Sequence, residues 1–298
     1  MSERERPVRS LLFVPGNRES WMRKALGLDA DALVFDLESA TPSGRADEAR
    51  SLVRGVLDTP RPERPLLFVR VRDARSAELE GDLEAVVCEG LSGVLLPQVI
   101  GPEDVRRLDQ ALGRREREAG LEPGRTLVMP LVETAQAARQ AYEIALASPR
   151  IAYMGGGVSR NGDIARSLGY RWTPEGLETL FLRSKVLLDV RAAGVFNPIS
   201  GLWGAVEDLE GLRAFAEQSR DLGYQGLMAI HPSHLDVIHQ VFTPSGEEID
   251  EWRRVIAELE AAEGEGRGAI RLDGRLIDHA HAETARRQLE WARKLGLI

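Results

Sequence analysis

The sequence predicts an α/β protein built as a (β/α)8 barrel (a TIM barrel) with a C-terminal helical arm, and three observations support this. The 298 residues suffice for a barrel of about 250 residues with an appendage. Short, continuously apolar runs alternate with longer segments of helical period along most of the chain. Eight such runs can be counted, which favours closure into a barrel over an open doubly wound sheet.

The eight apolar runs are expected to be parallel strands, because the segments between them are long enough for crossover helices that cover the outer face. The runs span 11–14, 32–35, 66–69, 93–96, 127–131, 151–154, 195–199 and 226–230. No GxGxxG motif follows the first run, which argues against a dinucleotide-binding sheet.

The segments between the runs carry apolar residues three and four positions apart, the pattern of surface helices. They span 21–28, 45–57, 79–87, 102–117, 135–147, 174–193 and 209–222. In the sixth of them, Thr173 is expected to be the cap and Pro174 the first helical residue.

The chain is expected to divide into a catalytic barrel, residues 1–242, and a helical extension or lid, residues 243–298. The extension reads as a helix, a glycine-broken stretch and a second helix, at 245–263, 264–278 and 280–295. Ser245 is a plausible cap for the first of these helices. Such an arm is expected to pack on a neighbouring subunit.

Composition excludes several classes of partner. With 47 acidic and 39 basic residues the net charge is −8, which argues against a nucleic-acid-binding surface. No apolar stretch approaches the roughly 18 residues of a membrane span, and the charged N-terminus does not resemble a signal peptide. The single cysteine, Cys88, suits a reducing compartment. We therefore expect a cytoplasmic protein without nucleic-acid or membrane partners.

Lysine usage bears on the chemistry. An imine-forming aldolase needs an amine inside the barrel. Only three lysines occur: Lys24 and Lys185 fall in predicted helices, and Lys294 lies near the end of the chain. Activation of a carbonyl group would then depend on a Lewis-acid metal.

Polar residues follow several of the expected strands, and in a barrel these strand ends meet at one mouth. The carboxylates of Asp36, Glu133 and Asp163 come from three such ends. If they point inward, a cation makes their crowding tolerable, and ligands that are only oxygen suggest Mg²⁺ or Mn²⁺. Arg70 ends the third strand, where it could hold a carboxylate or receive enolate charge. His231 is interpreted as a structural residue that leads into a helix.

Seven segments in register carry a family resemblance. They are RSLLFVPGNRE (9–19), DALVFDLESATPSGRADEAR (31–50), LFVRV (67–71), GVLLPQ (93–98), LVETAQ (131–136), AIHPSH (229–234) with VFTPSGEEI (241–249), and GAIRLDGRLID (268–278). In these segments the chain resembles the citrate lyase β-subunit/malyl-CoA lyase branch of the HpcH/HpaI aldolase superfamily. The resemblance implies a homotrimer or homohexamer that binds Mg²⁺ and acts on coenzyme A thioesters and 2-oxo acids.

The resemblance also implies residue roles. Glu133 and Asp163 match the family's metal ligands, and Arg70 matches the arginine that contacts the substrate oxygens. Asp278 matches a proton-transfer aspartate that the family's lid places over the adjacent subunit's site.

Further residues fall in the family's binding motifs. The acidic motif of the second strand puts Asp36 and Glu38 in the metal's water shell, as part of the catalytic group. The residues implied to lie near the thioester or nucleotide are Arg9, Phe13 and Pro15. Gln98 at the end of the fourth strand is also expected to bind substrate or CoA, as are Gly155 and Gly156, whose backbone can approach a ligand or merely turn.

The sequence departs from the family pattern around the mouth. Ser39 stands where the family usually has an acid, and Gln98 where it commonly has a lysine. Ser200 replaces an aspartate, and His234 a glutamine. An alignment without a gap puts Ser159 at the second metal position, whereas a gapped alignment puts Asp163 there; we prefer Asp163, because serine is a poor Mg²⁺ ligand.

The expected function is a Mg²⁺-dependent carbon–carbon lyase acting between a 3-hydroxyacyl-CoA, such as a malyl-CoA or citryl-CoA-like thioester, and an acyl-CoA plus a 2-oxo acid. Two enzyme alternatives stay open: a class II pyruvate aldolase that does not use CoA, and a hydroxyacyl-CoA thioesterase. A third alternative is a non-catalytic binding subunit on the same barrel.

Overall fold

The computed structural model describes residues 3–39, 43–60, 65–156 and 158–298. The chain forms two compact units, Met1–Phe242 and Thr243–Ile298.

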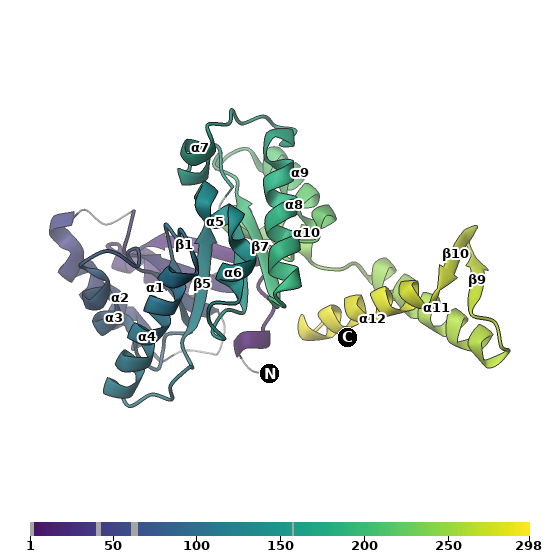
Figure 1. Ribbon diagram of the computed structural model, residues 1–298, viewed down its shortest axis with the longest axis horizontal. Helices are drawn as coiled ribbons and strands as arrows, with labels where there is room; N and C mark the ends of the chain where they lie inside the picture. Colours follow the sequence, from purple (N-terminus) through teal and green to yellow (C-terminus); the bar gives the residue numbers. More distant parts are fainter. Residues whose placement is uncertain (1–2, 40–42, 61–64, 157) are drawn as a thin grey trace. The chain divides into compact units, whose positions relative to one another are not determined.

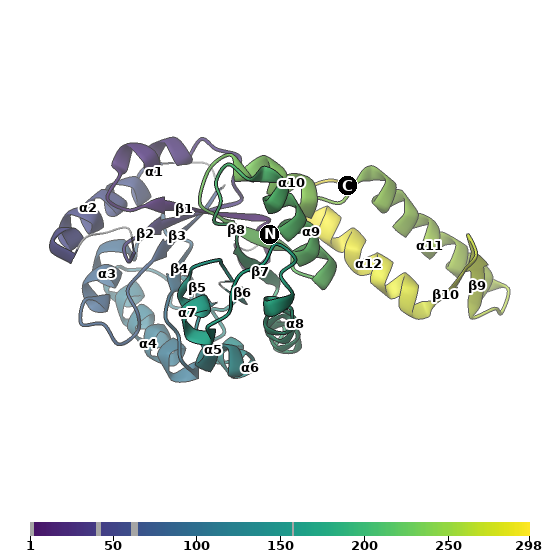
Figure 2. The ribbon, with the colours of Figure 1, turned by 90° about the horizontal axis from the view of Figure 1, so that it is seen from above.

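Within the described residues of the first unit, eight parallel strands form a closed barrel in which β8 pairs with β1. The strands are β1 (Ser10–Pro15), β2 (Ala32–Asp36), β3 (Leu66–Arg70), β4 (Gly93–Leu96), β5 (Leu127–Val132), β6 (Tyr153–Gly156), β7 (Asn197–Leu202) and β8 (Gly226–Ala229). Figure 2 shows the strands at the centre of this unit with helices around them. The predicted (β/α)8 barrel is confirmed.

The helices of this unit cover the outside of the barrel (Figure 1). They are α1 (Glu19–Ala25), α2 (Ala46–Leu57), α3 (Leu79–Val86), α4 (Pro102–Glu118), α5 (Ala135–Arg139), α6 (Ala141–Ala145), α7 (Asp163–Leu168), α8 (Leu177–Ala192), α9 (Leu209–Leu222) and α10 (His234–Phe242). Short 3₁₀ turns at Glu3–Glu5 and Ser43–Arg45 complete the unit.

Two helical expectations were wrong in detail. The helix expected at 174–193 is α8, which begins at Leu177 and not at Pro174, because Gly176 before it adopts a left-handed φ of 64°. Thr173 caps nothing, and its hydroxyl instead donates to Glu178 at 2.7 Å. The helix expected at 135–147 is broken into α5 and α6 at Gln140, whose φ of −112° lies outside the helical range.

Apolar side chains pack in two layers, one inside the ring of strands and one between the strands and the helices. Inward-facing residues such as Phe68, Met129 and Tyr153 form one cluster inside the ring of strands. Alternate residues such as Phe35 and Val69 pack outward against the helices. Because all four residues of β4 and all six of β5 are buried, these strands appear in the sequence as continuous apolar runs.

Polar contacts close the end of the barrel where the strands begin. The Tyr153 hydroxyl donates to the main-chain oxygens of Glu3 and Arg6, at 2.7 and 2.8 Å. Arg9, which precedes β1, forms a salt bridge to Asp31, which precedes β2, with Nε and Oδ2 2.8 Å apart. The opposite end is therefore the mouth.

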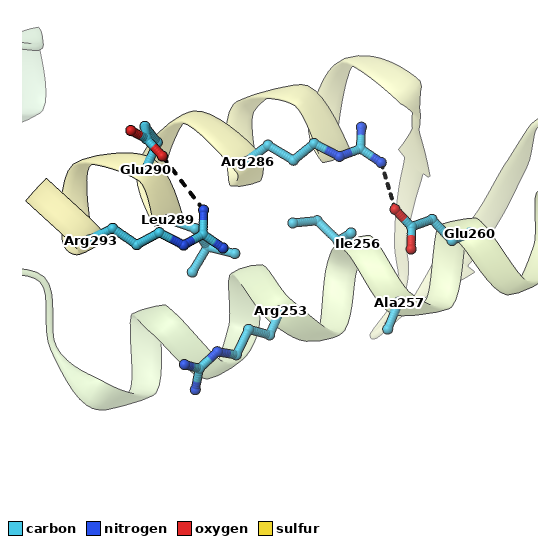
Figure 3. A pocket seen from close by; sticks show the side chains of 8 residues that line it. All are labelled: Arg253, Ile256, Ala257, Glu260, Arg286, Leu289, Glu290 and Arg293. Carbon is cyan, nitrogen blue, oxygen red and sulfur yellow. Dashed lines mark hydrogen bonds and ion pairs between the residues drawn. The ribbon is translucent and has the colours of Figure 1, made fainter. Parts of the chain in front are cut away.

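The second unit contains two helices that pack on each other and a two-stranded hairpin. Its elements are α11 (Gly246–Gly264), β9 (Ala269–Leu272), β10 (Arg275–Asp278) and α12 (His279–Lys294). Ser245 caps α11 in a capping box with Glu248, as the sequence predicts. Figure 3 shows Ile256 and Leu289 between the two helices, in a groove of about 530 Å³ that arginine and glutamate side chains also line.

The hairpin was missed in the sequence, where the stretch 264–278 was expected to be irregular. Leu272 pairs with Arg275 across a two-residue turn, Asp273–Gly274, in which both φ angles are positive (48° and 79°). Asp-Gly is a favoured sequence for this turn.

Among the described residues, no helix is both long and apolar enough to cross a membrane.

Candidate functional site

A cavity of about 450 Å³ lies at the mouth of the barrel. Its polar lining consists mostly of residues that end or follow strands, which is where a barrel collects its functional groups. The residues that line it are Phe13, Val14, Pro15, Asp36, Ser39, Arg70, Leu131, Glu133, Ser159, Gly162, Asp163, Leu202, Met228 and Ile230.

Glu133 directly follows β5 and is 8% exposed. The main-chain N–H of Gln98 donates to its Oε1 at 2.7 Å. Burial raises the pKa of Glu133 to about 7; the nearby charges of Asp163 and Glu38 add to the rise, whereas the Gln98 N–H and Arg70 oppose it. A cation beside such a buried carboxyl group would favour its ionised form.

Asp163 is the first residue of α7, so its side chain lies near unpaired N–H groups of the helix start. It accepts a hydrogen bond from Nε2 of Gln98 and forms an ion pair with Arg166. Gln98 thus links Glu133 and Asp163, the two predicted metal ligands.

Arg70 ends β3 and faces Asp36 at the end of the neighbouring strand β2. Its Nε and Nη2 donate to the two carboxylate oxygens of Asp36, at 2.8 and 2.7 Å, and its Nη1 lies 3.4 Å from Glu38 Oε2. The guanidinium carbon lies 5.2 Å from the centre of the Phe13 ring. Although burial favours the neutral form, the bond to Asp36 raises the pKa of Arg70. Asp36 is therefore occupied in orienting Arg70.

The donors present fit Mg²⁺ or Mn²⁺. Glu133 and Asp163 provide carboxylate oxygens, and Mg²⁺ is typically held by one or two carboxylates while it keeps several waters. Within the described residues, no group of three or more His, Cys, Asp and Glu side chains forms a ready-made metal cage.

Asp163 and Ser159 were the two candidates for the second metal position, and both line the cavity. Asp163 is the one that shares Gln98 with Glu133. The main-chain oxygen of Ser159 accepts a hydrogen bond from the Tyr170 hydroxyl at 2.7 Å, which holds the loop before α7.

The structure does not bring every predicted site residue to the mouth. Arg9 lies at the closed end, where it is paired with Asp31. Gly155 lies in β6, where an added Cβ would be 1.5 Å from a main-chain oxygen of β7, so its glycine serves strand packing. Gly156 ends β6 without such a clash. Asp278 belongs to the second unit, where it caps α12.

Sequence reasoning missed an apolar part of the cavity lining, made by Leu131, Leu202, Met228 and Ile230. These residues lie at or near the ends of β5, β7 and β8. Their position at strand ends is the signal in the sequence that indicates them. The lining therefore combines charged groups with apolar surface.

A serine, a histidine and an aspartate also meet at the closed end of the barrel. Ser10 Oγ lies 2.8 Å from Nε2 of His239, and Nδ1 of His239 lies 3.4 Å from Asp29 Oδ2. Ser10 is 0% exposed, and its hydroxyl also accepts the N–H of Asp31. Its burial excludes a substrate, so this group is structural.

Comparison with known proteins identifies relatives along almost the whole chain. Residues 9–232 match the family described as HpcH/HpaI aldolase/citrate lyase. A (3S)-malyl-CoA thioesterase of Cereibacter sphaeroides is 36% identical over 296 residues, covering 99% of this chain and 98% of the relative. The citrate lyase subunit beta of Escherichia coli is 33% identical over 292 residues, covering 98% and 95%.

Solved structures of similar fold also include citrate lyase proteins. Protein CitE of Mycobacterium tuberculosis, in complex with magnesium, acetoacetate and coenzyme A, is 28% identical and has a TM-score of 0.76, covering 97% of this chain and 99% of that one. A citrate lyase of Burkholderia xenovorans has a TM-score of 0.82 at 21% identity, covering 100% and 96%. The latter likeness concerns the fold alone.

Proposed function

Since the chain belongs to the HpcH/HpaI aldolase/citrate lyase family, we propose that it is a Mg²⁺-dependent carbon–carbon lyase that interconverts a 3-hydroxyacyl-CoA with an acyl-CoA and a 2-oxo acid. One observation carries this proposal: Glu133 and Asp163 are joined through Gln98 in a cavity that Arg70 also lines. Protein CitE of Mycobacterium tuberculosis is in complex with magnesium and coenzyme A, which supports the same ligands here.

In the cleavage direction, the hydroxyl of the substrate loses its proton and becomes the carbonyl of the 2-oxo acid. The bond between the carbinol carbon and the α-carbon of the thioester breaks, and its electron pair stays on the α-carbon as an enolate. That carbon then takes up a proton, so the reaction needs no oxidant or reductant.

The residues of this chain divide the work. Glu133 and Asp163 would hold the divalent cation, which supplies Lewis-acid polarisation of the oxo-acid oxygen atoms. Arg70 keeps its charge and is oriented by Asp36, so it can balance the negative charge of the thioester enolate. Phe13 beside Arg70, together with the apolar lining at Leu202, limits water around that charge.

We propose Asp278 as the proton-transfer group. Its hydrogen bond with His281 lowers the pKa of Asp278 and favours the ionised form, which is a weak base and would pass a proton on rather than keep it. This role requires the second unit to reach a mouth, its own or that of another subunit.

A thioesterase is the second candidate, because the similar Cereibacter sphaeroides protein bears that name. Hydrolysis through a covalent serine is excluded for Ser10, which is buried at the closed end. A thioesterase reaction would instead use a water molecule or a hydroxyl group at the mouth, where Ser39 and Ser159 line the cavity.

The experiment is to incubate purified protein and Mg²⁺ with (3S)-malyl-CoA and to separate the products by mass. The lyase yields acetyl-CoA and glyoxylate, whereas the thioesterase yields free CoA and malate. Glu133→Ala is expected to lose turnover and metal binding together, while the exposed Glu103→Ala serves as control. A fully active Glu133→Ala protein would contradict the assignment.

We also propose that the protein is a homo-oligomer located in the cytoplasm. One face of α8 supports self-association: Leu177, Phe181 and Leu188 are 70%, 81% and 69% exposed and follow helical spacing. Apolar faces of this kind commonly mark protein contacts. Light scattering on Phe181→Glu should give a smaller mass than the wild type, and Trp21→Glu, at another exposed site, should leave the mass unchanged.

A further inference from the structure

We propose that Gln98 is a positioning residue that fixes Glu133 and Asp163 relative to each other and thereby sets the affinity of the mouth for a divalent cation. The inference rests on the proposed function, because it takes these two carboxylates as the metal ligands. It concerns a residue that does not line the cavity but binds two residues that do.

Gln98 contacts the two carboxylates through different parts of one residue. Its main-chain N–H donates to Glu133 Oε1 at 2.7 Å, and its side-chain amide donates to Asp163 Oδ2. Its carbonyl oxygen accepts a hydrogen bond from Nη2 of Arg75 at 2.8 Å. Since both donors leave the same residue, a shift of Gln98 moves the anchor of both carboxylates.

The backbone of Gln98 is in the left-handed region, with a φ of 52°. Among the described non-glycine residues, only Asp273 shares this feature, and there the hairpin turn requires it. Glutamine is not one of the residues that tolerate this region well. Strained backbone of this kind persists where surrounding contacts hold it, and it collects at functional sites.

The contacts that hold the strain come from the two residues after Gln98. The oxygen of Val99 accepts the hydroxyl proton of Thr134, and the oxygen of Ile100 accepts the side-chain amide of Gln140, both at 2.9 Å. Thr134 directly follows Glu133 in the chain. The loop after β4 is therefore fastened to the same segment that carries the first ligand.

The neutral amide has an electrostatic consequence. Gln98 ties the carboxylates together without cancelling the negative charge that attracts a cation. Asp163 already has one cationic neighbour, Arg166.

The decisive variant is Gln98→Gly. Glycine adopts a φ of 52° without strain, so the loop and the N–H to Glu133 are kept and only the bond to Asp163 is lost. Titration with Mn²⁺, followed by electron paramagnetic resonance without substrate, should show a loss of affinity of about 10- to 100-fold, as is typical for groups that orient metal ligands. The melting temperature of the metal-free protein should be no lower than that of the wild type.

A second variant and a control complete the test. Gln98→Met keeps a side chain of similar length and the strained backbone but cannot donate, so it should lose Mn²⁺ affinity to a similar extent. Gln110→Ala, on the exposed side of α4, should change neither affinity nor melting temperature.

The outcomes separate the two proposals. Wild-type Mn²⁺ affinity in Gln98→Gly, together with a loss in Glu133→Ala, would overturn the role of Gln98 and leave the proposed function standing. A wild-type protein that binds no Mn²⁺ would overturn both. Loss of affinity in Gln98→Gly at unchanged melting temperature supports the positioning role, because a residue needed only for folding would not give it.

Discussion

The pairing of Arg70 with Asp36 makes the substitution Asp36→Asn informative. Both oxygens of Asp36 accept from Arg70, at 2.8 and 2.7 Å, in a partly buried setting. Asparagine keeps one acceptor but presents a donor amide at the other position, so one charge-assisted hydrogen bond is lost. Such bonds contribute about 1.5–3 kcal/mol. If that loss reaches the transition state, kcat/KM falls roughly 10- to 150-fold.

The assay compares kcat/KM for thioester cleavage with the Mn²⁺ affinity of the same protein. We expect kcat/KM to fall while Mn²⁺ affinity changes little, because Asp36 orients Arg70. The control is Asp47→Asn, whose carboxylate also pairs with an arginine but is 94% exposed. If Asp36→Asn lost Mn²⁺ binding as severely as Glu133→Ala, Asp36 would serve the cation, as the family motif implies, and the reasoning from its contacts would fail.

Three further predictions concern the scaffold. Glu116→Gln should lower the free energy of unfolding in urea by about 3 kcal/mol, because Glu116 is fully buried and accepts two hydrogen bonds from Arg150, at 2.6 and 2.7 Å. Burial favours the neutral form of Glu116, but the bond with Arg150 lowers its pKa below 4.5. The stability that the ionised Glu116 contributes is therefore complete above pH 4.5 and is lost as the pH falls through the lower pKa of the folded state. The difference in the free energy of unfolding between wild type and Glu116→Gln should accordingly narrow in acid. Gly155→Ala should prevent soluble expression, because its Cβ would lie 1.5 Å from a main-chain oxygen, whereas Gly156→Ala, with no atom closer than 3.9 Å, should fold. Ser245→Ala should cost about 1 kcal/mol, measured by thermal unfolding of the full chain, because it removes the cap of α11; an unchanged melting curve would contradict this.

The barrel could be predicted because strands buried on both faces leave continuous apolar runs in the sequence. Helix ends were less predictable where the backbone decides them. Pro174 favours a helix start in general, but the left-handed Gly176 postpones the start to Leu177. The Asp273–Gly274 turn could have been predicted from the sequence, since Asp-Gly is a preferred pair in two-residue hairpin turns.

The candidate site was predictable only in part. Because Asp36, Arg70 and Glu133 end or follow strands, the sequence predicts that they meet at the mouth, and all three line the same cavity. Arg9 shows the limit of a motif-based assignment, because a residue that precedes its strand lies at the other end of the barrel. The bridging by Gln98 was unpredictable, since it depends on a φ angle and on a loop that turns back toward β5.

The burial of the Ser10 hydroxyl affects how a hydrolytic activity of this protein would be detected. Organophosphorus reagents label serine hydrolases by reacting with an accessible, activated hydroxyl, and Ser10 offers no access. Labelling by such a reagent could therefore not come from Ser10, and a labelled protein would point to the serines that line the mouth, Ser39 and Ser159.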